Sequence, residues 1–440
     1  MNDLSILAAA SELPDGLCLR TDERDYSFGD IALMVRERLA RIDVLDQAPR
    51  CVVANADVRS IVEIYALLEL QIPFVLVHPA FTQRERSALY ERVAAMEEPL
   101  PPECAVVLFT SGTTGSPKAA MLSREALIAS AVSCAANIPL GPGDLWQLSI
   151  PPARIGGFSI LTRSLFARSA VGLPGKFSPE RFVQKLSEQK ATLSSIVPTM
   201  LAMILERFPD WRPPEHLRAL LVGGSAMNMR LRQKAAALHI PVITTYGMTE
   251  TASNFVTTPY ADRFEAKEGA GVPNAAVEVR EVDGALEVRT PALMLGYWGR
   301  GRVRSEDWFA TGDMGWIGED GQVHVRGRRS EMMITGGENV YPSEIEQHIE
   351  TIPGIRACRI IGMPDEVWGV IITALLVPEE GPLPDEGLRL ALASMLANYK
   401  RPRRIAWVNE LPVTASGKPD RSPDRLKGMD LAVMHYTALH

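Results

Sequence analysis

The sequence predicts an α/β protein with a large N-terminal domain, made of two α/β subdomains and a small β subdomain, and a small α+β C-terminal domain. Three observations support this class. Apolar runs of strand length alternate with helical patterns in the first half. Alternating strands around Asp-Gly turns follow from about residue 275. The sequence pattern changes again near Ser330, so we predict two domains in the 440 residues, a large one over 1–329 and a small one over 330–440.

In the first half, continuous apolar runs of strand length end in loops of small residues. The expected strands are 72–77, 104–109, 217–222 and 240–245, and the expected helices include 57–70, 178–190 and 229–238. Sheets covered by helices bind ligands beyond the carboxyl ends of their strands. We therefore expect a binding site among these loops.

The second half begins with short alternating strands. The expected strands there are 277–282, 285–290 and 322–326, followed beyond Ser330 by strands 358–361 and 371–377 and a helix over 385–397. The first pair flanks Asp283-Gly284, a turn signal typical of hairpins. This pattern predicts a mainly β subdomain and then a separate α+β unit.

Composition excludes several classes of protein. Lys and Arg number 46 and Asp and Glu 53, giving a net charge of −7, so the chain has no global attraction for nucleic acid or anionic membranes. The five cysteines are scattered without a C-x-x-C pair, which is typical of reduced thiols in a cytoplasmic protein. The histidines show no metal-ligand spacing, so no zinc site is expected.

The segment Thr110-Ser-Gly-Thr-Thr-Gly-Ser-Pro-Lys118 carries the strongest chemical signal. Consecutive small residues leave backbone N–H groups exposed, the hydroxyls add donors, and Lys118 adds a positive charge. This combination predicts a cradle for phosphates. It is not a Walker A loop, and the alternative is an ordinary loop.

Two further segments have weaker signals. In Thr245-Tyr-Gly-Met-Thr-Glu250 a tyrosine can stack on a purine, Thr249 can donate to a phosphate, and Glu250 suits Mg²⁺. The alternative is a helix start with Thr249 as its cap. In Thr311-Gly-Asp313 a carboxylate in a tight loop can accept hydrogen bonds from ribose hydroxyls, or can be a simple turn residue.

Five ordered segments together change the interpretation. They read FTSGTTGSPKAAMLS, TYGMTETAS, WFATGDMGW, GRRSEMMITGGENVYPSEIE and LPVTASGKPDR. The chain resembles the adenylate-forming ligases, which include acyl-CoA synthetases, luciferases and the adenylation domains of peptide synthetases, and the resemblance covers nearly its whole length. It implies that ATP activates a carboxylic acid as an acyl-adenylate, after which a thiol, usually that of coenzyme A, displaces AMP.

The resemblance also implies roles for individual residues. For ATP and AMP these are Thr110, Ser111, Gly112, Thr113, Thr114, Gly115 and Lys118 at the phosphates, Gly224, Ser225, Ala226, Tyr246, Gly247 and Met248 near the adenine, and Asp313 and Arg328 at the ribose. Catalysis falls to Lys418, Thr249 and Glu250, with Glu250 holding Mg²⁺. The acid is expected near Arg154, Gly157, Thr199, Gly223 and Gly247.

The small domain is implied to be mobile, rotating between the two half-reactions. Its pivot maps to Ser330, where many members have Asp or Lys. The rotation would replace Lys418 by a loop carrying Gly336 and Gly337, beside which coenzyme A passes. Lys400 belongs to a basic cluster that either attracts the phosphates of coenzyme A or is a solvated face.

The short region before the phosphate loop resembles the o-succinylbenzoate–CoA ligases of menaquinone synthesis. One departure concerns Arg154, which stands where that subfamily carries histidine. It either pairs with a substrate carboxylate or lies on the surface. Several alternatives stay open. The acid could be another aryl or medium-chain acid, and the thiol acceptor could be an acyl carrier protein. The protein could also bind nucleotide without ligase activity, and it could form a homodimer.

Overall fold

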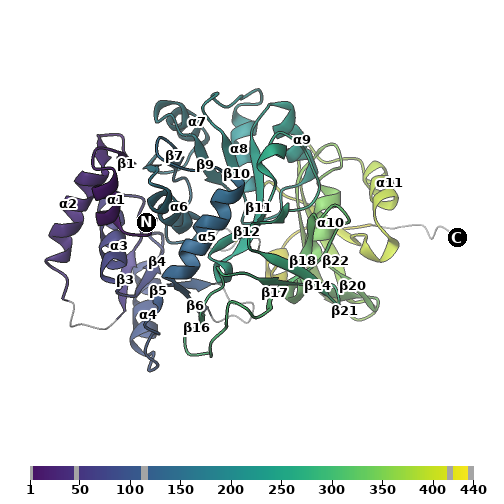
Figure 1. The fold of residues 1–440 in the computed structure, drawn as a ribbon. Helices are drawn as coiled ribbons and strands as arrows, with labels where there is room; N and C mark the ends of the chain where they lie inside the picture. Colours follow the sequence, from purple (N-terminus) through teal and green to yellow (C-terminus); the bar gives the residue numbers. More distant parts are fainter. Residues whose placement is uncertain (1–2, 44–48, 111–116, 414–419, 435–440) are drawn as a thin grey trace.

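The computed structural model describes residues 3–43, 49–110, 117–413 and 420–434 (Figure 1). Its largest sheet has nine strands and its second sheet five, with a four-stranded sheet beside them and another in the C-terminal part. This arrangement confirms the predicted fold class, a large α/β domain with an added β subdomain and a small α+β domain.

The nine-stranded sheet has a parallel centre, in which β11, β10, β9, β7, β8 and β1 are neighbours. In spatial order the sheet contains β13 (Val272–Pro273), β12 (Ser253–Thr257), β11 (Val242–Met248), β10 (Ala219–Val222), β9 (Leu193–Ile196), β7 (Leu145–Gln147), β8 (Ala170–Gly172), β1 (Leu17–Arg20) and β2 (Asp25–Ser27). Short apolar runs form these central strands because both faces are covered by helices.

The five-stranded sheet carries the predicted phosphate segment. Its strands are β16 (Gly296–Tyr297), β6 (Lys118–Ser123), β5 (Cys104–Thr110), β4 (Phe74–Val77) and β3 (Arg50–Val53). Strand β5 runs antiparallel to β6, and Thr110 of β5 lies opposite Lys118 of β6, so the two ends of the predicted phosphate segment are neighbours.

Helices cover both sheets and fill the space between them. They are α1 (Ile6–Glu12), α2 (Phe28–Leu39), α3 (Val58–Leu70), α4 (Gln83–Ala94), α5 (Arg124–Asn137), α6 (Ile155–Ala167), α7 (Pro179–Glu188), α8 (Pro198–Arg207) and α9 (Met229–Ala237). Side chains fix the starts of several: Asp57 accepts from the Ser60 N–H at 2.7 Å and caps α3. Helix α5 packs against both β6 and β12, and one apolar core includes strands of both sheets.

The remaining strands form the β subdomain and the small domain. The β subdomain contains β14 (Glu278–Val282), β15 (Ala285–Arg289), β17 (Phe309–Ile317) and β18 (Val323–Arg328). The small domain contains β19 (Met333–Thr335), β20 (Glu338–Val340), α10 (Pro342–Ile349), β21 (Ile355–Asp365), β22 (Gly369–Pro378), α11 (Asp385–Met395), β23 (Arg404–Trp407) and β24 (Ala432–Val433). Between them Ser330 lies exposed in a short 3₁₀ turn, η3 (Arg329–Glu331).

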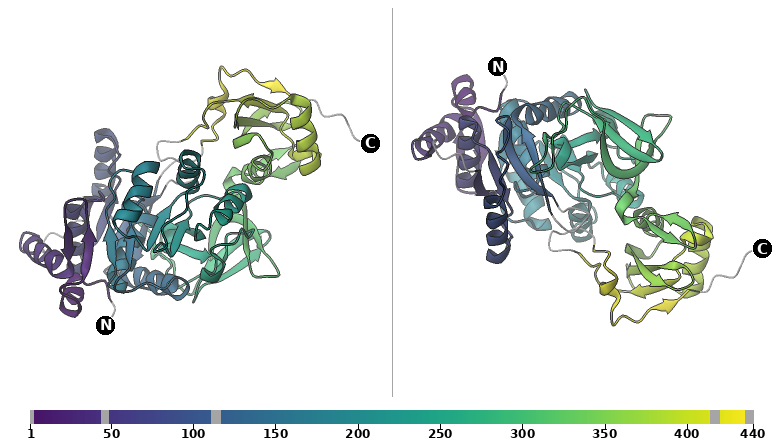
Figure 2. Two further views of the ribbon diagram at one scale, coloured as in Figure 1. Left: turned by 90° about the horizontal axis from the view of Figure 1, so that it is seen from above. Right: turned by 90° about the horizontal axis from the view of Figure 1, so that it is seen from below.

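Polar contacts hold the small domain beside α8 and α9 (Figure 2). Asn228 donates to Glu350 at 2.9 Å, and Arg356 pairs with Glu206 at 2.9 Å. The Arg356–Glu206 pair is largely exposed, and exposed ion pairs contribute about 1 kcal/mol or less each. An ion pair this weak is compatible with the predicted rotation about Ser330. Both the rotation and the domain boundary at Ser330 stay predictions.

Among the helices that the structure describes, none has the length and apolar character needed to cross a bilayer.

The packing between the sheets yields a stability prediction. Phe158 of α6 is fully buried and meets Phe74 of β4 edge-on, with ring centroids 6.1 Å apart. Phe158→Ala should lower the free energy of unfolding by about 3–5 kcal/mol, because it removes buried apolar surface and leaves a cavity. Urea unfolding measures this. Leu33→Ala, at a 59% exposed site on α2, is the control, and equal losses in both variants would contradict the proposed role of the shared core.

Candidate active site

The carboxyl ends of three parallel strands lie side by side and define the site. Val222 of β10 is opposite Ile196 of β9 on one side and Thr244 of β11 on the other. Thr199 lies at the start of α8, directly after β9, and Tyr246 and Gly247 lie in the last three residues of β11. Residues Gly223–Ala226 follow β10, and Gly224, Ser225 and Ala226 are exposed. The sequence-predicted adenine and acyl segments are thus brought together at one edge of the sheet, as the carboxyl-end rule requires.

Glycines are needed here by close packing. A Cβ on Gly223 would come within 2.0 Å of the Thr245 hydroxyl, and one on Gly247 within 2.2 Å of the Ser253 carbonyl oxygen. At the start of α6, a Cβ on Gly157 would come within 2.3 Å of the Pro151 carbonyl oxygen. A side chain at Gly157 or Gly247 would displace backbone, and one at Gly223 would displace the Thr245 side chain. The local fold therefore requires glycine at these positions whatever they bind.

Asp313 lies between two donors from different sheets. The Tyr246 hydroxyl donates to Oδ2 of Asp313 at 2.6 Å, and Arg328 Nε is 2.8 Å from Oδ1. The Asp313 side chain is only 5% exposed. Burial raises the pKa of Asp313, and the charge of Arg328 opposes this rise. A carboxylate offers about four acceptor positions, so two remain for ribose hydroxyls.

The predicted loop around Asp313 is wrong in one respect. Asp313 lies inside strand β17, paired with Arg328 of β18, and not in a tight turn. The sequence predicted a loop at Thr311 and Gly312 because Gly and Thr are common in turns. Gly312, at φ 77°, provides the local irregularity, and the Thr311 hydroxyl bonds to the Leu286 carbonyl at 2.8 Å.

Thr249 and Glu250 begin a 3₁₀ turn, η1 (Thr249–Thr251), directly after β11. The alternative of Thr249 as a helix cap is wrong, since Met248 occupies the cap position and no long helix follows. The Glu250 side chain is buried, and its Oε1 accepts a 2.6 Å hydrogen bond from the Tyr297 hydroxyl. Burial and the Glu250 carboxylate raise the pKa of Tyr297, so the phenol donates at neutral pH.

Lys118 lies close to this pair. Its Nζ is 5.1 Å from the centre of the Tyr297 ring, a cation–π distance. The structure thus brings Lys118, at the end of the phosphate segment, together with Glu250, the predicted metal ligand. The predicted residues Ser111, Gly112, Thr113, Thr114, Gly115 and Lys418 lie outside the described residues; Thr110 bonds through its hydroxyl to the Lys118 carbonyl at 3.3 Å.

The residues present fit a magnesium ion held mainly by nucleotide phosphates. Within the described part of the chain, no group of three or more His, Cys, Asp or Glu could form a protein-only metal cage. Mg²⁺ in nucleotide sites needs one or two carboxylates, with phosphate and water oxygens completing its shell. Glu250, with one oxygen bonded to Tyr297, supplies a single oriented carboxylate of this kind.

Arg154 lies at the cap position of α6, partly buried and without a capping hydrogen bond from its side chain. Burial lowers its pKa, and its charge contributes to lowering the pKa of His78, after burial of that ring. The Arg154 side chain is therefore neither fully exposed nor deeply buried, and its pairing with a substrate carboxylate stays a prediction.

The predicted coenzyme A residues lie on the small domain, apart from this set. Gly336 and Gly337 have φ of 58° and 86° and are exposed on the β19–β20 hairpin. The Gly336 N–H donates to the Trp368 carbonyl at 2.9 Å, and the Arg403 guanidinium stacks 3.7 Å from the Trp368 ring centre. Lys400 is 2.5 Å from Glu344, within the same domain.

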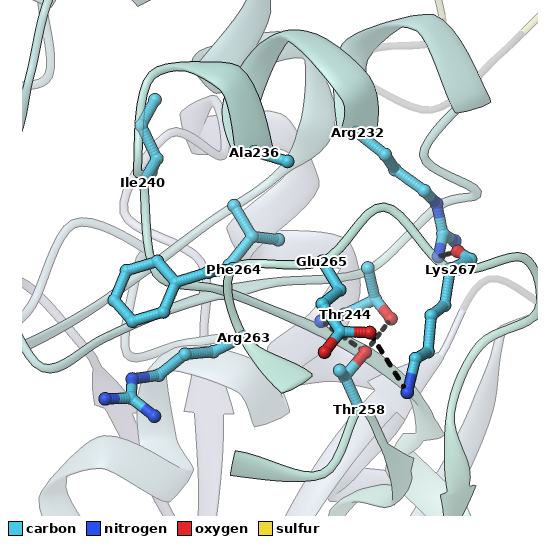
Figure 3. Close-up of a pocket in the computed structure, with 10 residues that line it drawn as sticks. Arg232, Ala236, Ile240, Thr244, Thr258, Arg263, Phe264, Glu265 and Lys267 are labelled. Carbon is cyan, nitrogen blue, oxygen red and sulfur yellow. Dashed lines mark hydrogen bonds and ion pairs between the residues drawn. The ribbon is translucent and has the colours of Figure 1, made fainter. Parts of the chain in front are cut away.

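A small cavity behind β11 is a separate feature (Figure 3). It is lined by Arg232 of α9, Thr244 of β11 and the segment around Arg263 and Lys267. Its volume of about 10 Å³ has room for about one water molecule. Burial lowers the pKa of Arg232 to about 10, and its guanidinium donates to the Met227 and Lys267 carbonyls. This cavity is a packing feature and not the substrate site.

Sequence reasoning missed Tyr297 and Trp368. Tyr297 reaches Glu250 only because β16 pairs with β6, placing Tyr297 opposite Ala120. Trp368 reaches Gly336 across a hairpin. The available signal was an aromatic residue next to glycine, in Gly296-Tyr297 and Trp368-Gly369, which by itself is common.

Comparison with known proteins agrees with this geometry. The model of the AMP-binding enzyme family matches residues 33–298, and that of the AMP-binding enzyme C-terminal domain matches residues 344–418. A 2-succinylbenzoate–CoA ligase of Listeria monocytogenes is 32% identical over 399 residues, covering 90% of this chain and 83% of the relative. An Enterococcus faecalis protein of the same name is 32% identical, covering 83% and 78%.

Solved structures agree as well. The o-succinylbenzoate CoA synthetase (MenE) from Bacillus subtilis, in complex with its acyl-adenylate intermediate, has a TM-score of 0.83 and 26% identity, covering 99% of each chain. The same enzyme with ATP and magnesium also has a TM-score of 0.83, covering 94% of this chain and 98% of that one. By sequence and by structure, the chain belongs to the AMP-binding enzyme family of adenylate-forming ligases.

Proposed function

We propose that this protein is an ATP-dependent acid–CoA ligase whose acid is o-succinylbenzoate. The observations that support the proposal are two contact sets at the end of β11: Tyr246 with Asp313 and Arg328, and, four residues further along the chain, Glu250 with Tyr297, whose ring faces Lys118. The named activity of the Listeria and Bacillus relatives supports the choice of acid. Free thiols such as the five cysteines persist in the cytoplasm, where we place the reaction.

In the first half-reaction, a carboxylate oxygen of the acid attacks the α-phosphorus of ATP, and the bond to pyrophosphate breaks. Asp313 and Arg328 hold the ribose, and the Tyr246 ring flanks the adenine. Lys118, Thr249 and Lys418 supply positive charge and donors where negative charge develops. Magnesium, held by Glu250 and the phosphates, neutralises phosphate charge.

In the second half-reaction, the thiol of coenzyme A loses its proton and attacks the acyl carbon, and AMP leaves. Gly336 and Gly337 lack Cβ atoms, so a pantetheine chain can pass close to their backbone. Arg403, stacked on Trp368, and Lys400 belong to the basic cluster proposed for the phosphates of coenzyme A. Because Gly336 and Gly337 lie on the small domain, we propose that rotation about Ser330 precedes this step.

The second carboxylate of the acid has a proposed partner. This partner is Arg154, which is partly enclosed, so that a charge-assisted hydrogen bond there is stronger than in water. Gly157 and Thr199 complete the proposed acyl side. A carrier protein as thiol acceptor is the alternative candidate, and a homodimer stays a prediction.

The activity itself is tested with a panel of acids. Pyrophosphate exchange into ATP should occur with o-succinylbenzoate and fall with benzoate, anthranilate and medium-chain fatty acids. Thioester formation with free coenzyme A separates the ligase from a carrier-loading enzyme. Exchange with none of the acids would favour a nucleotide-binding protein that has lost ligase activity.

Lys418→Ala tests the division between half-reactions. Loss of its charge should slow adenylation by about 10²–10³-fold, since it removes one donor to the transition state. Thioester formation from preformed acyl-adenylate should change far less. Lys427→Ala, at a side chain 79% exposed, is the control. Equal losses in both half-reactions would contradict the role given to Lys418.

Arg154→Met tests recognition of the diacid. It should raise the KM for o-succinylbenzoate by about 10-fold or more, because hydrogen bonds to charged groups contribute about 1.5–3 kcal/mol. The KM for ATP should stay unchanged. Arg207→Met, at a side chain 62% exposed, is the matched control. An unchanged KM for the diacid would remove Arg154 from the acyl site.

A further inference from the structure

The segment Met294–Trp298 connects the two parts of the phosphate and metal site. On one side the Met294 N–H donates to the Glu250 carbonyl at 2.8 Å. On the other side the segment pairs with β6, and the Trp298 N–H donates to the Ala119 carbonyl at 2.8 Å, one residue from Lys118. Backbone hydrogen bonds therefore fix this segment between the metal carboxylate and the strand that follows the phosphate loop.

Tyr297 is the side chain of this segment that contacts both groups. Its hydroxyl donates to Glu250 Oε1 at 2.6 Å, and its ring lies 5.1 Å from Lys118 Nζ. Among the residues that the structure describes, it is the Tyr297 hydroxyl that donates a hydrogen bond to the Glu250 carboxylate. Lys118 and Glu250 thus contact two different parts of the same side chain, the ring face and the hydroxyl.

A purely structural role would leave the hydroxyl unused. The Tyr297 ring packs against the main apolar core, and the backbone of the segment is held by its own hydrogen bonds. A phenylalanine would satisfy both requirements. The 2.6 Å bond to a buried carboxylate is what the hydroxyl adds, and it leaves the second oxygen of Glu250 for a cation.

We propose that Tyr297 is a positioning residue for the metal in the first half-reaction, fixing the orientation of the Glu250 carboxylate through its hydroxyl. This inference rests on the proposed function, since it concerns the Glu250 and Lys118 of that site. Outer-shell donors of this kind typically change metal affinity or activity by about 10–100-fold when removed.

Tyr297→Phe removes the hydroxyl and keeps the ring over Lys118. Calorimetry with the unreactive α,β-methylene analogue of ATP, over a range of magnesium concentrations, gives the affinity for the metal in the nucleotide complex. We expect about 10-fold weaker magnesium binding or more, with binding of the analogue in the absence of magnesium unchanged. The CoA step from preformed acyl-adenylate should keep its rate.

Tyr65→Phe is the matched control. Tyr65 of α3 is fully buried and its hydroxyl donates to the Leu161 carbonyl at 3.4 Å, so the same chemical change is made outside the site. Unchanged magnesium affinity in Tyr297→Phe would overturn the inference, and so would an equal loss of analogue binding without magnesium. Failure of the proposed function looks different, because the wild-type protein would then show no pyrophosphate exchange.

Discussion

The Asp313 carboxylate, held between Tyr246 and Arg328, is the interaction on which the arrangement of the site depends. Tyr246 belongs to the nine-stranded sheet, whereas Asp313 and Arg328 belong to the β subdomain, so this cluster joins two sheets across the nucleotide site. Burying a carboxylate is costly unless it is paired and hydrogen-bonded. Arg328 also lies two residues before Ser330, so the same ion pair fixes the large-domain side of the predicted hinge.

Close approach of backbone is the second constraint. Gly223 and Gly247 allow β10, β11 and β12 to converge where substrates would enter, and the same glycines were candidates for binding. Close packing and ligand binding would both require glycine at these two positions. Glycine at a strand end therefore does not by itself distinguish a ligand site from a tight junction, and the neighbouring Asp313 and Glu250 make the distinction.

Sequence reasoning succeeded where a signal is local. Sequence periodicity and turn chemistry correctly predicted helix α3, the buried strands, and the hairpin around Asp283-Gly284. It failed where long-range pairing overrides local preference. Asp313 was expected in a turn because of Thr311 and Gly312, but the register with Arg328 makes it part of a strand. Tyr297 gave no usable signal, since its partner Glu250 is distant in sequence.

The sequence by itself determined the class of fold, the order of the motifs and the chemistry that they resemble, because strand and helix periods and loop composition are local properties. Only the tertiary structure decided which side chains meet: Tyr246 with Asp313, and Tyr297 with Glu250 and Lys118. The physical reason is that these contacts depend on strand order and register. Both arise from packing of the whole core, and no short segment encodes them.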